Sequence, residues 1–252
     1  MKIFIPTSGC TDSIGVLYYI LSSSSFKKDE ITTCLIDSIP IGISKKDVGE
    51  GEIEKYLSAC KWLTDNVRSF NYNIFTEGKD LDLDWDLHKQ TYNDNNFIIK
   101  ESEVISKSQY LRASLAKKYK ADRVITGLNL SNWYSANWFY FPNHPKLKYP
   151  YSVIKHLLGE IPFEKPFVEQ EKGKFEVYES IPDDLKKECF MGQPHRIKMM
   201  KWYHDKKKEG KTASELDDYV MKAGHFGKYW LEHPDHDTAT RMDNKKFMYE
   251  MK

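Results

Sequence analysis

The stretch that decides the fold is KIFIPTSGCTDSIGVL, residues 2–17. Residues 2–6 form a short, mostly apolar run of strand-forming type, and Ile14, Leu17 and Leu21 then recur at helical spacing. Between these two runs, residues 8–13 are small or polar, with a glycine at position 9. The pattern predicts a strand, a tight loop and a helix.

The same alternation continues through the first 130 residues. Further strands are predicted at 31–36, at 72–75 and within ADRVITGLN, residues 121–129, and one-sided apolar patterns predict helices at 53–67 and 104–119. Alternating strands and helices indicate an α/β fold, a parallel sheet flanked by helices on both faces. Ligands of such sheets bind outside the carboxyl ends of the strands, so we expect residues 8–13 and 127–132 to share one edge.

After residue 131 the sequence changes character. An aromatic and proline-rich stretch follows, and helices are predicted at about 181–189, 194–208 and 213–224, the last with Thr212 and Glu215 at capping-box spacing. We therefore predict a sheet domain over residues 1–165 and a smaller, mainly helical C-terminal region over 166–252.

Bulk composition narrows the class of protein. The 252 residues are 40% apolar, enough for a substantial core, and 38 basic against 37 acidic residues give a net charge of +1. A net charge this small gives no overall positive potential that would attract nucleic acid, although the Lys206–Lys208 run is a local candidate for such a contact. Four dispersed cysteines without a CxxC pair, no signal peptide and no long apolar run favour a cytoplasmic protein without membrane segments.

The loop at residues 8–13 has the composition of a phosphate site. A strand–turn–helix joint points backbone N–H groups outward beside the positive end of the helix dipole, which favours a bound phosphate. Gly9 permits close backbone approach, the hydroxyls of Ser8, Thr11 and Ser13 can donate hydrogen bonds, and Asp12 can hold Mg²⁺ or orient the loop. The alternative is an ordinary helix start capped by Ser8 or Thr11.

Three segments resemble a known family. KIFIPTSGCTDSIGVL resembles the S-G-G-x-D-S signature of the PP-loop ATP pyrophosphatases. SQYLRASLAKKYKADRVITGLNLSN, residues 108–132, is similar to the arginine-bearing helix and G-x-N turn of the 7-cyano-7-deazaguanine synthase group, with Arg112, Gly127 and Asn129 matching. KGKFEVYESIPDDLKKEC, residues 172–189, resembles the lysine segment of that group, with Lys174 and Cys189 matching.

The resemblance implies an ATP- and Mg²⁺-dependent enzyme whose nucleotide-binding domain is residues 1–165. Such enzymes cleave ATP between the α and β phosphates and transfer AMP to a substrate, here a small-molecule carboxylate or amide that is then amidated or ligated. The implied nucleotide-binding residues are Ser8, Gly9, Cys10, Thr11, Asp12, Ser13, Gly127 and Asn129. The implied catalytic residues are Asp12, Arg112 and Lys174, with Asp12 as the metal ligand.

The sequence does not identify the second substrate. Aromatic side chains that follow the Gly127 turn could stack on a planar, purine-like heterocycle, and ordinary packing of these side chains is the alternative. The residues are Trp133, Trp138, Tyr140 and Phe141. A homodimer is compatible with the sequence. The acidic run with Asp80, Asp82, Asp84 and Asp86 is read as a surface loop rather than a cation site.

The sequence departs from the family pattern in three places. Cys10 stands where the family has its second glycine, and Asn132 stands where an acid is usual. The four-cysteine zinc end is missing, so only a site built from Cys189, His195 and His204 is conceivable. Two alternatives therefore stay open: a tRNA-modifying adenylating enzyme, with Lys117, Lys118 and Lys120 joining the 206–208 run in a basic face, and a nucleotide-binding regulatory protein without catalysis.

Overall fold

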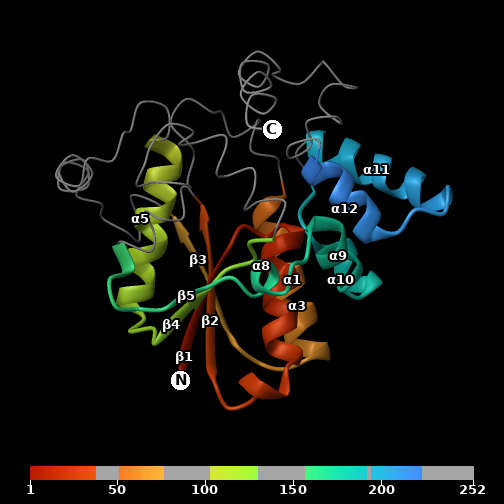
Figure 1. Cartoon of the computed structure of the whole chain (residues 1–252). Coiled ribbons are helices and arrows are strands. Elements are labelled where there is room, and N and C mark those ends of the chain that lie inside the picture. The colour runs from red at the N-terminus through yellow and green to blue at the C-terminus, as the bar shows by residue number, and fades with distance from the viewer. Residues whose placement is uncertain (38–50, 77–102, 130–156, 192–193, 223–252) are drawn as a thin grey trace.

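A five-stranded, fully parallel sheet organises the molecule (Figure 1). The computed structural model describes residues 1–37, 51–76, 103–129, 157–191 and 194–222. The strand order is β3-β2-β1-β4-β5. The strands are β1 (Lys2–Thr7), β2 (Glu30–Asp37), β3 (Asn71–Thr76), β4 (Arg123–Ile125) and β5 (Phe163–Glu164). The first four are the strands that the sequence pattern predicts.

Helices cover both faces of this sheet, which confirms the predicted fold class. Helices α1 (Thr11–Ser22) and α3 (Glu52–Asn66) pack on the face that carries Ile3 and Ile5. Helix α5 (Glu103–Lys118) packs on the other face, against Phe4 and Cys34. Strand β1 is buried on both faces because it lies at the centre of the sheet, as a continuous apolar run favours.

Among the described residues, five further helices follow the sheet, in agreement with the predicted, mainly helical C-terminal region. They are α8 (Pro166–Glu169), α9 (Lys174–Glu179), α10 (Asp183–Glu188), α11 (Pro194–Lys208) and α12 (Ala213–Lys222). The predicted capping box forms: Glu215 N–H donates to Thr212 Oγ1 over 3.2 Å, and Thr212 N–H donates to Glu215 Oε2 over 2.8 Å. The boundary at 165/166 stays a prediction.

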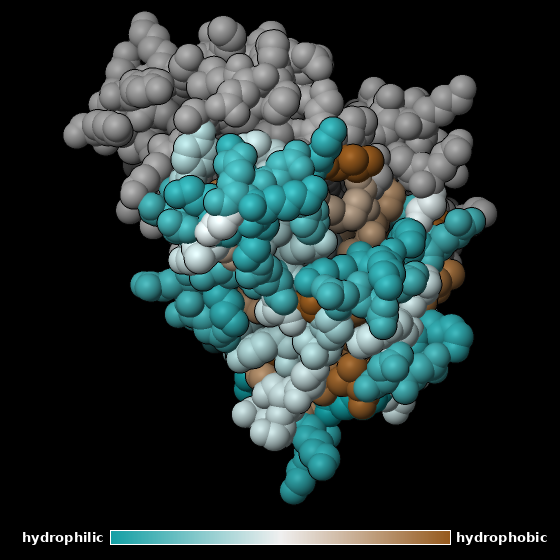
Figure 2. All heavy atoms as spheres, turned by 90° about the vertical axis from the view of Figure 1, so that its right-hand side faces the viewer, coloured by the Kyte–Doolittle hydropathy of each residue, from teal (hydrophilic) through white to brown (hydrophobic). Residues whose placement is uncertain are grey.

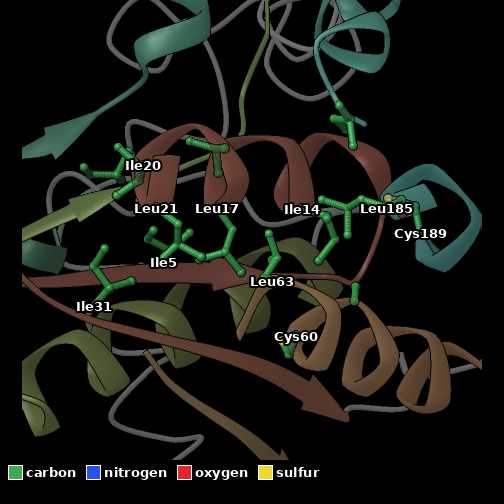
Figure 3. Packing of buried hydrophobic residues seen from close by; sticks show 14 of the residues in the cluster. Ile5, Ile14, Leu17, Ile20, Leu21, Ile31, Cys60, Leu63, Leu185 and Cys189 are labelled. Atoms are coloured by element: carbon green, nitrogen blue, oxygen red, sulfur yellow. Dashed lines mark hydrogen bonds between the residues drawn. The ribbon is translucent and has the colours of Figure 1, made fainter. Parts of the chain in front are cut away.

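Two cores divide this C-terminal region. The core beneath α1 and α3 also contains Phe167, Val177, Ile181 and Leu185. Leu185 and Cys189 lie near Ile14 at the N-terminal end of α1 (Figure 3). A second cluster joins α9 to α11 and α12 through Phe175, Met199, Met200, Tyr203, Ala213 and Leu216. Helix α9 therefore contributes to both cores and links α1 to α12.

The surface on the side of α11 and α12 is mostly hydrophilic, with small apolar areas between polar ones (Figure 2). No helix within the described residues is long and apolar enough to span a membrane. Several regions singled out in the sequence lie outside the described residues: the acidic run at 80–86, Asn132, and the aromatic side chains at 133–141.

Candidate functional site

The loop at the carboxyl end of β1 consists of Ser8, Gly9 and Cys10, and helix α1 begins at Thr11. Gly9 adopts φ +67°, a conformation that favours glycine. A Cβ at this position would lie 3.4 Å from the Cβ of Tyr56 and 3.6 Å from the carbonyl oxygen of Glu52 in α3. An added Cβ would thus make only ordinary van der Waals contacts with α3, and it is the positive φ of the turn that favours glycine here.

Polar groups of the loop bind one another. Gly9 N–H donates to Thr7 Oγ1 over 3.1 Å, and Ser8 N–H donates to Ser13 Oγ over 3.2 Å. Ser13 Oγ in turn donates to the carbonyl oxygen of Cys10 over 3.0 Å. These bonds fix the path of the backbone before the first turn of α1, so the serines act on the loop geometry itself.

Capping of α1 differs from the alternative considered above. The N-cap residue is Cys10, and no side-chain hydrogen bond caps the helix. Thr11 Oγ1 instead donates to Met191 Sδ over 3.3 Å. The alternative interpretation of residues 8–13, an ordinary helix start capped by Ser8 or Thr11, therefore does not describe this loop. Cys10 Sγ lies 2.9 Å from Ser8 Oγ, so the cysteine side chain takes part in the hydrogen bonding within the loop.

A buried ion pair joins the loop to the C-terminal region. Lys174 Nζ lies 2.6 Å from Asp12 Oδ2, and the two side chains are 10% and 13% exposed. Lys174 is the first residue of α9, and 162 positions separate it from Asp12. The other carboxylate oxygen, Asp12 Oδ1, is buried and has no hydrogen-bond partner within the described residues. Two of the three predicted catalytic residues thus meet at the N-terminus of α1.

The turn after β4 reaches the same place. A Cβ on Gly127 would lie 2.1 Å from the carbonyl oxygen of Asp12 and 3.0 Å from the Cα of Ser13, so only glycine fits. Asn129 follows two residues later and is fully buried. The two loops that the sequence assigned to one sheet edge, residues 8–13 and the turn beginning at Gly127, are therefore in direct contact.

Arg112, the third predicted catalytic residue, lies in α5 on the opposite face of the sheet. Its half-buried side chain is close enough to Cys34 to affect that thiol: burial raises the pKa of Cys34 to about 12, and the charge of Arg112 partly opposes the shift. Within the described ranges, no hydrogen bond or ion pair joins Arg112 to residues 8–13. Its predicted contact with phosphate stays a prediction.

Two contacts with the site escaped sequence reasoning. Phe190 N–H donates to the carbonyl oxygen of Gly9 over 2.9 Å, and Phe190 forms a parallel bridge with Cys10. Asp217 of α12 accepts hydrogen bonds from the backbone N–H groups of Phe175 and Glu176 in α9. No local motif signals either contact, because the partners are far apart in the sequence.

Asp217 makes stability depend on pH. Burial raises its pKa from 3.8 to about 7, although the two backbone N–H groups oppose that shift. Between these values the folded state binds the proton and the unfolded state does not, so the free energy of unfolding falls as pH rises from about 4 to 7, by at most about 1.4 kcal/mol per pH unit. Chemical denaturation across this range should show the fall in wild type and a smaller one in Asp217→Asn; equal pH profiles would contradict it.

The zinc hypothesis is only partly addressed, because the side chain of His195 lies outside what the structure describes. The Cys189 thiol donates to the carbonyl oxygen of Leu185 over 3.5 Å, and burial raises its pKa to about 12, so the metal-binding thiolate is disfavoured. His204 Nε2 lies 3.3 Å from the hydroxyl of Tyr178. In the part of the chain that is described, no three histidine, cysteine, aspartate or glutamate side chains gather to hold a metal ion.

A magnesium role for Asp12 rests on different chemistry. Mg²⁺ is usually held by one or two carboxylates together with substrate phosphates and water, so a complete protein cage is not needed. Asp12 Oδ1 is buried without a hydrogen-bond partner among the described residues, while Oδ2 accepts from Lys174. The carboxylate therefore fits a cation delivered with phosphates.

Comparison with known proteins identifies the fold. No protein-family model and no curated protein sequence matches the chain significantly. A solved structure that matches is the U34-tRNA thiolase NcsA from Methanococcus maripaludis with its [4Fe-4S] cluster, with a TM-score of 0.50 and 13% sequence identity over 100% of this chain and 72% of that chain.

The cysteines of this chain do not fit such a cluster. All four lie within the described residues and are buried, and no three of them gather there. Burial raises the pKa of Cys34, Cys60 and Cys189 to about 12, whereas iron–sulfur clusters are held by thiolates. What the comparison shows for the two proteins is a shared fold.

Proposed function

We propose that this protein is an ATP-dependent enzyme of the PP-loop ATP pyrophosphatase class, which transfers AMP to a small-molecule carboxylate or amide and releases pyrophosphate. The observation that carries the proposal is the buried Asp12–Lys174 pair at the N-terminus of α1, against the Gly127 turn. A helix N-terminus, a lysine and a carboxylate with one available oxygen are what a bound nucleoside triphosphate and its metal require. The fold shared with a tRNA thiolase adds support.

In the proposed reaction, an oxygen of the second substrate attacks the α phosphorus of ATP. The bond between that phosphorus and the bridging oxygen breaks, and pyrophosphate leaves with the electron pair. The N–H groups at the start of α1 and the Lys174 ammonium would hold the departing phosphates, which makes catalysis a matter of positioning and charge. Bound Mg²⁺, held through Asp12 Oδ1, would neutralise phosphate charge. Arg112 is a further candidate for the same task.

The nitrogen of ammonia or an amine would then attack the acyl carbon of the adenylate: the C–N bond forms, the C–O bond to AMP breaks, and AMP leaves with the electron pair while the nitrogen loses a proton. We favour amidation or ligation over sulfur transfer, because sulfur transfer needs thiolates. Burial raises the pKa to about 12 for the thiols of Cys34, Cys60 and Cys189. We place the activity in the cytoplasm, since all four cysteines are buried thiols rather than disulfides. A purine-like heterocycle remains our candidate for the second substrate, and a homodimer remains compatible with the proposal.

The second candidate function is tRNA modification, favoured by the solved structure of the U34-tRNA thiolase. Against it, each lysine of the predicted basic run has an acidic neighbour. Lys206 pairs with Glu209, Lys207 with Glu179 and Lys208 with Asp205. Acidic partners reduce the field available to RNA phosphates. Tight, salt-dependent binding of unmodified tRNA would favour this second candidate over the first.

The proposed reaction is tested with the full-length chain, Mg²⁺, candidate carboxylates, ammonia and ATP labelled at the α phosphate. We expect AMP and pyrophosphate to appear in equal amounts, and the rate to fall at least about a hundredfold in Asp12→Ala, because a carboxylate and its bound metal are lost together. Asp65→Ala is the control, since Asp65 forms an exposed ion pair with Lys61. Tight ATP binding without turnover by any carboxylate would leave a regulatory protein instead.

A further inference from the structure

Asp217 of helix α12 caps the N-terminus of helix α9. Its carboxylate is buried, with 1% of the residue exposed, and its two oxygens serve two different donors. Oδ1 accepts from Phe175 N–H over 3.0 Å, and Oδ2 accepts from Glu176 N–H over 2.9 Å. The N-cap residue of α9 is Gly173, which has no side chain to offer. Asp217, which is 42 positions after Phe175 in the sequence, therefore performs the capping that is usually local.

Gly173 makes this contact sterically feasible. A Cβ at that position would lie 2.2 Å from Asp217 Cγ and 2.5 Å from its Oδ1. Any other residue would push the carboxylate of Asp217 away from the first turn of α9. The Asp217 cap therefore depends on glycine at position 173, although α12 and the start of α9 are far apart in the sequence.

The residue between Gly173 and Phe175 is Lys174, whose ammonium group binds Asp12 over 2.6 Å. Helix α9 spans only six residues, so it cannot hold its own position without tertiary contacts. Those contacts are the Asp217 cap, the apolar cluster around Phe175, and the packing of Val177 against Gly15 of α1. A Cβ added to Gly15 would lie 2.8 Å from Val177 Cγ1. The backbone from which Lys174 projects is therefore held from α12.

We propose that Asp217 is a positioning residue: by capping α9 it places Lys174 against Asp12. The consequence for nucleotide binding rests on the proposed function, whereas the placement of Lys174 does not. Loss of the Asp217 carboxylate frees two buried N–H groups and allows the first turn of α9 to shift. Lys174 then spends less time at the 2.6 Å distance from Asp12.

Two measurements on the full-length chain at pH 8 test this. The first is the rate at which an acylating reagent modifies the Lys174 amine, followed by mass spectrometry with the exposed Lys61 as internal reference. We expect at least about a threefold faster reaction in Asp217→Ala. Asp217→Asn keeps one acceptor oxygen and should fall between Asp217→Ala and wild type, and it replaces Asp217→Ala where that variant does not fold.

The second measurement is a double-mutant cycle on ATP affinity. Lys174→Met and Asp217→Ala should each weaken ATP binding, and the double variant should be no weaker than Lys174→Met alone, because Asp217 acts through Lys174. The control is Thr212→Ala, which removes the cap of α12 itself and leaves the carboxylate of Asp217 intact. It should change neither readout.

The outcomes separate the two claims. Three results would overturn the positioning role. Lys174 could react at the wild-type rate in both Asp217 variants, or Thr212→Ala could change lysine reactivity and ATP affinity as much as Asp217→Ala does. The effects of Lys174→Met and Asp217→Ala on ATP affinity could also prove additive. If no variant, Lys174→Met included, alters ATP binding, the proposed function fails. The lysine reactivity still decides the role of Asp217 in that case.

Discussion

Replacing Asp12 by alanine should lower the free energy of unfolding by about 3 kcal/mol. The change removes the carboxylate that lies 2.6 Å from Lys174 Nζ and leaves an ammonium group whose side chain is only 10% exposed. Removing one partner of a buried pair is costly because the remaining charge loses its compensation away from water. Urea denaturation at pH 7, with fluorescence and circular dichroism as probes, measures the loss.

The exposed pair Lys61–Asp65 provides the matched control, with the same 2.6 Å separation but side chains that are 73% and 53% exposed. Asp65→Ala should leave stability nearly unchanged, since water already solvates both groups. Lys174→Met is the converse variant: it removes the ammonium group, leaves the buried Asp12 carboxylate without its counter-charge and should therefore also destabilise the protein. Equal losses in Asp12→Ala and Asp65→Ala would show that the Asp12–Lys174 pair is not buried in solution.

Replacing Gly127 by alanine should cost about 3 kcal/mol or more. The added Cβ would lie 2.1 Å from the carbonyl oxygen of Asp12 and 2.6 Å from its carbonyl carbon. Both are backbone atoms, so relief requires the turn after β4 to separate from the first turn of α1, and overpacking of this kind is destabilising. The same separation should weaken nucleotide binding, because it deforms the loop at Asp12 and Ser13.

Gly159→Ala is the control for this change. Gly159 has φ +64° and, among the residues that the structure describes, no neighbour within 4 Å of an added Cβ, so alanine there meets the conformational penalty of about 1 kcal/mol. Thermal unfolding of both variants compares the two costs directly. A Gly127→Ala protein as stable as Gly159→Ala would contradict the close contact between the two loops.

Much of the fold follows from local patterns. Strand β1 and helix α1 were predictable because an apolar run gives way to helical spacing at Ile14, with a glycine and small polar residues between them. The meeting of Asp12 with the Gly127 turn was predictable from a general rule, since parallel strands bring their carboxyl ends to one edge. Lys174 was reached by family resemblance alone, because nothing in its local sequence points to Asp12.

The rest of the site depends on contacts that local sequence cannot encode. Asp217 reads as one more polar residue of an amphipathic helix, and only packing of α12 against α9 makes it a buried cap. Phe190 reaches Gly9 because α10 ends beside the loop, which no spacing rule foresees. The N-cap at Cys10 was likewise missed, because serine and threonine are favoured there and cysteine is not.

The most direct test of the central claim is equilibrium binding of ATP with Mg²⁺ to wild type and to Lys174→Met. A charge-assisted contact between Lys174 and phosphate predicts that wild type binds ATP and that the variant binds it at least about tenfold more weakly. Asp65→Ala, measured in parallel, should bind as wild type does. Absence of ATP binding to wild type, or equal affinity in Lys174→Met, would contradict the assignment of residues 8–13 and Lys174 to a nucleotide site.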